Sequence, residues 1–414
     1  MANFALITIG DELIKGELSN KNSILVAKIL NTKGHNLEKI ITIGDNKKRI
    51  ISSLKKVCKQ FNYIIVTGGL GPTQDDKTRE AIAEASNKEL VFFEDVADKI
   101  SSYFRNRSLK MTENNFRQAY FPEGVQILKN PRGTAPGFKL NWENSLIYVL
   151  PGVTEEMTEI LKQELDNTCN MNENNNDYIL KIAGIGEAEL EDKLLKIIEN
   201  SQHKYRFLPR RGEIEIRIKR NKKDDKISST TLKSELKKIK EILGNNIFSQ
   251  KEDKGLPEAV KETAINHDTS LSLAESCTGG LIGKRLTDVP GASNFFAGGI
   301  IAYNNDIKKK LLNVRPDTLK SQGAVSKETA KEMAIGVNQL TKTTISASVT
   351  GIAGPGGGTR NKPVGLVYFA LYHNDKVFVE KWNLNGGRSK IRWFTSQHVL
   401  NYIRIYLLEE LSKE

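Results

Sequence analysis

Short apolar runs that end in glycine alternate with segments of helical periodicity, and this alternation most constrains the fold. "FALITIG", "YIIVTGG" and "SLIYVLPG" are typical of buried strands, whereas "SNKNSILVAKILNTKG" has apolar residues at helical spacing. This order favours a parallel sheet with helices on both faces. Ligands of such sheets bind at the carboxyl ends of the strands, so the loops that follow the strands are the first candidates for a site.

Two polar stretches divide the chain of 414 residues, "DNTCNMNENNND" at 166–177 and "GNNIFSQKEDKGLP" at 244–257. A chain of this length has room for two or three cores. We expect domains at residues 1–168, 177–248 and 256–414. The first and last are α/β by their strand and helix order, and the middle one is a small α+β domain.

Charge and composition exclude several classes of protein. The net charge is +12, but residues 204–240 hold 14 Lys/Arg against 5 Asp/Glu, so the excess belongs largely to one segment. No apolar run approaches a membrane span and the start lacks a signal peptide pattern, so we expect a cytoplasmic protein with no membrane partner. Three widely spaced cysteines predict neither a disulfide framework nor a zinc site.

The loops of the first domain carry glycines and carboxylates. They read "GDELIKG", "TGGLGPTQDDKT", "NPRGTAPGF" and "LPGV". Glycines let backbone N–H groups approach a phosphate, and a helix starting at Asp76 would add its positive end. Asp11, Asp75 and Asp76 offer oxygen ligands for a divalent metal ion held against a pyrophosphate. The alternative is that Asp76 only caps a helix and the glycines only form turns.

These four loops resemble the signature motifs of the molybdopterin-binding-like domain that opens the CinA (competence/damage-inducible protein A) family. The resemblance implies the fold of the molybdopterin adenylyltransferases and, in the CinA branch, metal-dependent hydrolysis of ADP-ribose. Adenylyltransferases have a threonine after the paired glycines and a proline before the glutamate, and "GGLGPTQDDKTRE" lacks both. This departure disfavours synthesis of the molybdopterin cofactor, which is kept as the alternative. The residues placed at the nucleotide site are Gly68, Gly69, Gly71, Thr78, Gly133 and Thr134.

The middle segment opens with "YILKIAGIGEAELEDKL", a strand, a glycine turn and a helix, and continues with the half-exposed strand pattern "EIEIRIKR". It resembles the KH type of RNA-binding fold. A KH domain grips nucleic acid with a two-glycine loop between two helices, whereas "GIGE" follows a strand. We expect a basic spacer domain without a nucleic-acid partner, with nucleic-acid binding as the alternative.

The last domain places a serine and a lysine after neighbouring strand patterns. In "TSLSLAESCTGGLIGKRL" a strand precedes Ser276 and a helix is expected to begin near Thr278, leaving unpaired N–H groups that can receive an oxyanion. "GGIIAYNNDIKKKLLNV" predicts a strand ending at Tyr303 and a helix from Asn305. Lys308 then lies in the first turn, where the helix dipole favours a neutral amine that can activate a serine. The alternative is a solvated lysine surface.

Further loops could close a pocket around this pair. "TGIAGPGGGTRNKP" can wrap backbone donors around a phosphate. Ser326 is a helix cap, and "NGGRSKIRWF" places Arg388 and Arg392 one turn apart, on a helix surface or against a phosphate.

"AESCTGG", "AYNNDIKKKLL", "GAVSKETA", "TGIAGPGGG", "KPVGLVYF" and "GGRSKIR" closely resemble the C-terminal domain of the same family, the nicotinamide-nucleotide amidase. The resemblance implies hydrolysis of nicotinamide mononucleotide to nicotinate mononucleotide and ammonia, with Ser276 as nucleophile, Lys308 as base and no cofactor. Gly387 stands where the family commonly has the aspartate of "GDR". The substrate-binding residues implied are Thr278, Gly279, Gly280, Tyr303, Gly354, Gly356, Gly357 and Arg388.

The sequence therefore predicts a homodimeric hydrolase of pyridine-nucleotide salvage that acts on nicotinamide mononucleotide and on ADP-ribose. The alternatives are a protein of the same family with an inactive amidase domain that binds nucleotides or nucleic acid, and a molybdopterin adenylyltransferase-like enzyme.

Overall fold

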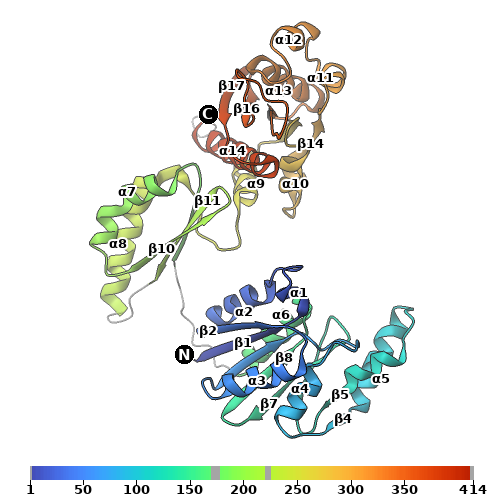
Figure 1. Ribbon diagram of the computed structural model, residues 1–414. Helices are drawn as coiled ribbons and strands as arrows, with labels where there is room; N and C mark the ends of the chain where they lie inside the picture. Colours follow the sequence, from blue (N-terminus) through green and yellow to red (C-terminus); the bar gives the residue numbers. More distant parts are fainter. Residues whose placement is uncertain (1, 169–177, 220–224, 411–414) are drawn as a thin grey trace. The chain divides into compact units, whose positions relative to one another are not determined.

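The computed structural model describes residues 2–168, 178–219 and 225–410. The chain forms two compact units, Met1–Asn175 and Asn176–Glu414, and each is described by itself (Figure 1). Of the three cysteines, Cys58 and Cys277 are buried free thiols, and Cys169 lies outside the described residues. Within the described ranges, no helix is both long and apolar enough to cross a membrane.

The first unit is built on a six-stranded sheet in the order β2-β1-β3-β8-β7-β6. The expected parallel pairing holds for β2, β1, β3 and β8, whereas β7 and β6 pair antiparallel, so the sheet as a whole is mixed. The reason is local: only Glu143 and Asn144 separate β7 from β8, and so short a connection can join only antiparallel strands. The strands are β1 (Asn3–Ile9), β2 (Asn36–Ile43), β3 (Tyr63–Thr67), β6 (Gln126–Leu128), β7 (Gly137–Trp142) and β8 (Ser145–Leu150).

Helices cover both faces of this sheet, as expected (Figure 1). Alternate residues of β1 enter different cores: Phe4 and Leu6 pack with α2 and α6, whereas Ala5 and Ile7 pack with α3 and α4. A two-stranded sheet of β4 and β5 adjoins α5. The elements are α1 (Asp11–Ile14), α2 (Lys21–Thr32), α3 (Lys47–Cys58), α4 (Thr78–Ala85), β4 (Leu90–Phe92), α5 (Glu94–Asn106), η1 (Glu113–Ala119), β5 (Tyr120–Pro122) and α6 (Thr154–Thr168).

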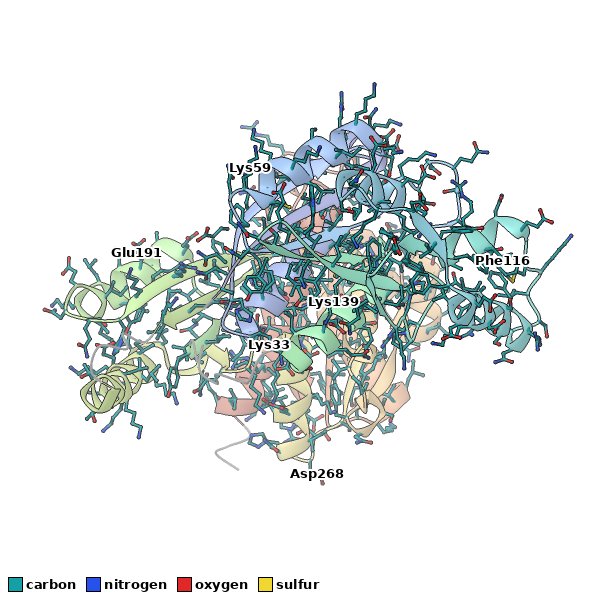
Figure 2. All side chains as sticks on the ribbon, turned by 90° about the horizontal axis from the view of Figure 1, so that it is seen from below. Lys33, Lys59, Phe116, Lys139, Glu191 and Asp268 are labelled. Atoms are coloured by element: carbon teal, nitrogen blue, oxygen red, sulfur yellow. The ribbon has the colours of Figure 1, made fainter. Side chains whose placement is uncertain are left out.

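Helix α6 is fixed to its neighbours by two ion pairs. Lys33 contacts Asp166, and Lys139 Nζ lies 2.7 Å from Glu164 Oε2; Figure 2 labels both lysines. These contacts fix the last turns of the helix, whereas its first residue, Thr154, follows β8 closely and donates from its hydroxyl to Asn22 Oδ1 of α2.

The second unit begins with the expected small α+β domain. Its antiparallel sheet has the order β10-β11-β9-β12, and α7 and α8 pack on one face around Leu180, Leu194, Ile216 and Leu232. The elements are β9 (Tyr178–Ile182), α7 (Glu187–Glu199), β10 (Lys204–Arg210), β11 (Glu213–Lys219), α8 (Asp225–Leu243), η2 (Gly244–Asn246) and β12 (Ile247–Ser249).

The rest of this unit is the expected α/β domain with a mixed five-stranded sheet, β14-β13-β15-β16-β17. β13 pairs in parallel with β14 and β15, and β16 and β17 continue antiparallel. The largest core joins α9, α10 and α14 to one face of the sheet, and α11 and α13 pack on separate clusters. The elements are α9 (Leu256–Asn266), β13 (Leu271–Glu275), α10 (Leu281–Thr287), η3 (Ala292–Asn294), β14 (Phe296–Ile301), α11 (Asn305–Leu312), α12 (Pro316–Ser321), α13 (Lys327–Thr341), β15 (Ile345–Gly351), β16 (Leu366–His373), β17 (Lys376–Asn383) and α14 (Arg388–Glu409). Ser326 caps α13 as predicted, by accepting from the Thr329 N–H.

Candidate active site

Ser276 is the first residue after β13, at the carboxyl end of a strand that lies between β14 and β15 in the last sheet. Its backbone N–H donates to Val349 O of β15 over 2.9 Å, which continues the parallel pairing by one residue. Its side chain is nearly buried, with 7% of the residue exposed. The serine is therefore held by the sheet itself rather than by a mobile loop.

A glycine turn separates this serine from the next helix. Gly279 and Gly280 have φ values of +57° and +86°, in the left-handed region that favours glycine. A Cβ at Gly280 would lie 2.9 Å from Ile301 Cδ1. This turn delays the helix, so α10 begins at Leu281 and the expected start near Thr278 is wrong.

Lys308 reaches the serine from the neighbouring strand connection. Its helix begins at Asn305 as predicted, and its Nζ lies 3.0 Å from Ser276 Oγ. The same nitrogen lies 2.7 Å from Ala302 O and 3.4 Å from Tyr303 O. Only 1% of the residue is exposed, so the structure puts the lysine in the protein interior and not on a solvated surface.

Burial sets the protonation of this amine. It lowers the pKa of Lys308 from 10.5 to about 8, because the charged form loses its hydration. A thiolate at the neighbouring Cys277 would raise the pKa of Lys308 again. Burial raises the pKa of this thiol to about 12, however, so the thiol is neutral near pH 8 and does not favour the charged amine. A neutral amine has two N–H groups and one lone pair. The carbonyls of Ala302 and Tyr303 can accept the N–H groups, which leaves the lone pair for the Ser276 hydroxyl.

Glu275 fixes the loop that carries the nucleophile. Its carboxylate is 3% exposed and accepts from the Ile282 N–H over 3.2 Å and from the Gly283 N–H over 2.7 Å. We predicted unpaired N–H groups after Ser276, but these two are satisfied by Glu275. The carboxylate therefore positions α10 against β13, a role that the sequence pattern did not reveal.

Two arginines of α14 form hydrogen bonds to the loops that surround the Ser276–Lys308 pair. Arg388 donates to Gly354 O over 2.8 Å and to the Tyr303 hydroxyl over 2.5 Å. Arg392 donates twice to Thr278 O, over 2.6 and 3.1 Å. Helix α14 thus connects four residues that we expect at the substrate, namely Arg388, Gly354, Tyr303 and Thr278. Arg392 is hydrogen-bonded to a backbone carbonyl and does not lie on a solvated helix surface.

The remaining residues of this predicted site differ in their surroundings. Thr278 Oγ1 is fully buried and has no hydrogen-bond partner among the described residues. Gly356 and Gly357 lie in an exposed part of the glycine loop, and a Cβ at Gly356 would meet no atom within 4 Å. Gly387 is the N-cap of α14, without a side-chain cap and with open space around its Cβ position. An aspartate there would face that space.

In the first unit, the glycine loop after β3 is held by α4. A Cβ at Gly68 would lie 2.1 Å from Ile9 O, so the two strand ends approach closely there. Thr78 is fully buried, and its hydroxyl donates to Gly68 O over 2.8 Å. Buried Arg79 donates to the carbonyls of Leu70 and Gly71 over 2.7 and 2.8 Å. Thr78 therefore anchors the loop, and α4 begins at Thr78 instead of at Asp76 as predicted.

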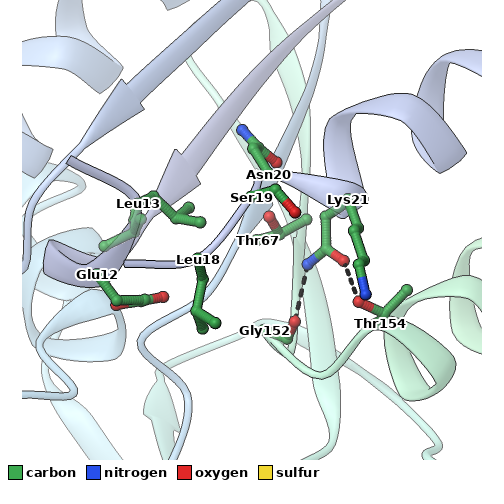
Figure 3. Close-up of a pocket in the computed structure, with 11 residues that line it drawn as sticks. Glu12, Leu13, Leu18, Ser19, Asn20, Lys21, Thr67, Gly152 and Thr154 are labelled. Atoms are coloured by element: carbon green, nitrogen blue, oxygen red, sulfur yellow. Dashed lines mark hydrogen bonds between the residues drawn. The ribbon is translucent and has the colours of Figure 1, made fainter. Parts of the chain in front are cut away.

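Two cavities of the first unit are lined by residues of its predicted loops. One, of about 280 Å³, is lined by Thr67 and Gly152 at the strand ends and by Asn20 before α2. Figure 3 shows Gly152 and Thr154 beside this cavity. Asn22 joins them, because its amide donates to Gly152 O and accepts from the Thr154 hydroxyl, over 2.8 Å each. The other, of about 310 Å³, contains Gly133 and Thr134. Gly68, Gly69, Gly71 and Thr78 line neither of these two cavities.

The predicted metal ligands do not converge. Asp11 exchanges backbone-to-carboxylate hydrogen bonds with Asp45, of 2.8 and 3.1 Å, while Asp76 Oδ2 accepts from the N–H and hydroxyl of Thr73. Burial raises the pKa of the Asp45 carboxyl, and the charges of Glu12, Asp11 and Asp75 add to this. In the described part of the chain, no group of three His, Cys, Asp or Glu residues is arranged to hold a metal ion. These residues do not fit a preformed metal site, and the divalent ion stays a prediction.

Family models of known proteins match all three domains. Family models match residues 5–169 as a probable molybdopterin binding domain, 178–249 as the damage-inducible protein CinA KH domain and 253–407 as the CinA C-terminal domain.

The relatives match over nearly the full length of the chain. A competence-damage inducible protein of Halothermothrix orenii is 41% identical over 407 residues, covering 97% of this chain and 98% of its own length. One from Clostridioides difficile is 38% identical over 411 residues, with the same coverage of 97% and 98%. Among solved structures, the competence/damage inducible protein CihA of Agrobacterium tumefaciens is 38% identical, with a TM-score of 0.36, and covers 38% of this chain and 98% of its own. The chain therefore belongs to the competence/damage-inducible protein family, CinA.

Proposed function

We propose that the C-terminal domain is an amidohydrolase that converts nicotinamide mononucleotide to nicotinate mononucleotide and ammonia. The observation that carries this proposal is the buried Ser276–Lys308 pair, with 3.0 Å between Oγ and Nζ. A serine becomes an effective nucleophile when a base removes its proton, and an amine with a pKa of about 8 can do so near neutral pH. The family resemblance of the surrounding loops supports the substrate.

The reaction needs only these two side chains and water. Ser276 Oγ attacks the carboxamide carbon while its proton passes to Lys308 Nζ, forming a tetrahedral oxyanion. The oxyanion collapses, the C–N bond breaks, and Lys308 returns the proton to the departing amine, which leaves as ammonia. Water then attacks the acyl ester with Lys308 again as base, releasing the carboxylate and restoring the serine hydroxyl. Each proton taken from a nucleophile returns to a leaving group, so the enzyme is unchanged.

The loops around the pair suggest how the substrate lies. Tyr303 is 58% exposed, so the face of its ring is available for stacking on a pyridine. Arg388 lies beside it, bonded to the Tyr303 hydroxyl and to the glycine loop at Gly354. We assign the ring to Tyr303 and the phosphate to the side of Arg388 and the exposed glycines that follow Gly354, since a guanidinium and exposed backbone donors suit a phosphate.

A direct test is to trap the acyl ester. The reaction with nicotinamide mononucleotide is quenched in acid, and the digested protein is analysed by mass spectrometry. We expect a nicotinate mononucleotide adduct on the peptide that contains Ser276 and none in Ser276→Ala. Ser321→Ala, which removes an exposed serine of α12, is the matched control and should still form the adduct. Ammonia release without any adduct would point to direct attack by water and overturn the serine mechanism.

A second activity, hydrolysis of ADP-ribose, is proposed for the first domain. The cavity at the ends of β1 and β3, together with the start of α6, supports a ligand there, because helix starts and strand ends of α/β sheets favour phosphates. If a divalent ion is required, EDTA should abolish release of AMP from ADP-ribose and leave ammonia release unchanged. Loss of ammonia release in EDTA would contradict the serine-lysine assignment.

A further inference from the structure

A groove of about 630 Å³ lies between the hairpin of β10 and β11 and one face of α14. Its lining residues differ from those placed at the proposed amidase site. Arg210 and Arg211 come from the hairpin, and Lys390, Trp393 and Phe394 come from the helix. Three of its seven lining residues are cations, two are aromatic and none is a carboxylate. This composition favours a ligand that is both anionic and aromatic.

The walls of the groove are fixed by hydrogen bonds between the hairpin and the helix. Trp393 Nε1 donates to Arg211 O over 2.8 Å, and Gln397 donates to the same carbonyl over 3.0 Å. Arg285, which does not line the groove, packs with its Cζ 4.3 Å from the centre of the Trp393 ring. These bonds use only the backbone of Arg211, and the residue itself is exposed.

We propose that this groove binds a nucleoside phosphate. Its volume lies within the range of roughly 300 to 1,000 Å³ typical of small-molecule sites. A base can stack on the indole and phenyl rings, and the cations suit the phosphate, with arginine able to bind it through two parallel hydrogen bonds. Arg210 already contacts Glu215 Oε2 over 3.3 Å, so Arg211 and Lys390 are the main candidates for the phosphate. A ligand without a base would leave the aromatic wall unused, and a ligand without a phosphate would leave the charges of Arg211 and Lys390 unused.

The groove is a second site, although α14 connects it to the first. Trp393 and Phe394 follow Ser389 and Lys390 by one helical turn, so these four side chains form one face of the helix. Arg388 and Arg392 lie on the adjacent face, where they hold Gly354 and Thr278. Binding in the groove therefore does not depend on the amidase chemistry and is tested separately from it.

Fluorescence of Trp393 in the full chain tests the proposal. The chain has three tryptophans, so the W142F/W382F variant reports on Trp393 alone. We expect AMP to change its emission saturably, and adenosine or inorganic phosphate to bind at least about tenfold more weakly, because each lacks one half of the recognised group. Adding Arg211→Ala and Lys390→Ala should raise the Kd for AMP about tenfold or more. Lys237→Ala with Lys238→Ala removes the same charge from the exposed face of α8 and should leave the Kd unchanged.

Three results would overturn the proposal. They are no saturable change with millimolar AMP, an unchanged Kd when Arg211 and Lys390 are both replaced, and equal binding of AMP and inorganic phosphate. The last would mean an anion site without base recognition. If single-stranded DNA changes the emission and AMP does not, the ligand of the groove is a polymeric nucleic acid and not the proposed nucleoside phosphate.

Discussion

Lys308 Nζ lies 3.0 Å from Ser276 Oγ although the two residues are 32 positions apart in the chain. The topology of the last sheet produces this contact. β13 and β14 are parallel neighbours, with Glu275 opposite Ile301, so the residues that follow both strands leave the same edge of the sheet. Ser276 continues from one strand and the helix that carries Lys308 from the other.

The pKa of Lys308 predicts how ammonia release depends on pH. Only the neutral amine can accept the serine proton, and its pKa is about 8. We expect kcat/KM for nicotinamide mononucleotide to rise about tenfold per pH unit below that value and to level off above it. The profile is measured from steady-state ammonia release between pH 6 and 9.5. A flat profile through this range would mean that another group is the base.

The same pKa predicts a pH-dependent stability. Burial lowers the pKa of Lys308 from 10.5 to about 8, so between these values the unfolded chain binds a proton that the folded chain has lost. The free energy of unfolding of the wild type, relative to Lys308→Met, should therefore rise with pH across this window, by up to about 3 kcal/mol. Urea unfolding of both proteins at pH 7.5 and at pH 10.5 measures the change. Equal differences at the two pH values would contradict the lowered pKa.

Glu275 is expected to act through the position of the nucleophile loop. Glu275→Ala leaves the N–H groups of Ile282 and Gly283 without their acceptors, and each such buried group costs about 1–3 kcal/mol. We expect a lower Tm and a lower kcat with little change in KM. Glu275→Gln keeps one acceptor oxygen and should fall between the wild type and the alanine variant in both measurements. An alanine variant with wild-type Tm and kcat would remove Glu275 from the account.

Much of this arrangement is predictable from the sequence because it follows from strand order. Glycine-bearing loops after apolar runs identify the ends of parallel strands, and these ends meet at one edge of a sheet. Ser276 and Lys308 could be paired on this basis, and the helix start at Asn305 agrees with the pattern. The antiparallel β7 and β8 could be anticipated only from the two residues that join them.

The rest depends on side-chain contacts that leave no periodic signal. Glu275 caps a helix that begins only after two left-handed glycines, and Arg392 reaches Thr278 from 114 positions away. The family resemblance places Thr78 at the nucleotide site, but no pattern in the sequence showed that its side chain is buried and bonded to Gly68 O. Asp45 follows the end of β2 as Asp11 follows the end of β1. Because β1 and β2 are neighbours, this shared position at a strand end is the feature of the sequence from which the Asp11–Asp45 hydrogen bonds could have been predicted.

The aspartate that this chain lacks at position 387 is expected to affect stability more than chemistry. Gly387 is the N-cap of α14 and has open space at its Cβ position. Gly387→Asp adds a side-chain acceptor for the first turn and should stabilise the protein by about a few tenths of a kcal/mol. Gly387→Ala adds a Cβ without an acceptor and serves as the matched control, with a Tm no higher than that of the wild type. Destabilisation by aspartate would show that position 387 does not cap the helix.

The most direct test of the central claim is ammonia release from nicotinamide mononucleotide by the purified chain, with Ser276→Ala and Lys308→Met measured beside it. The account predicts steady release by the wild type, accompanied by an equal amount of nicotinate mononucleotide, and its loss in both folded variants. Undiminished release by either variant, or none by the folded wild type, would contradict it.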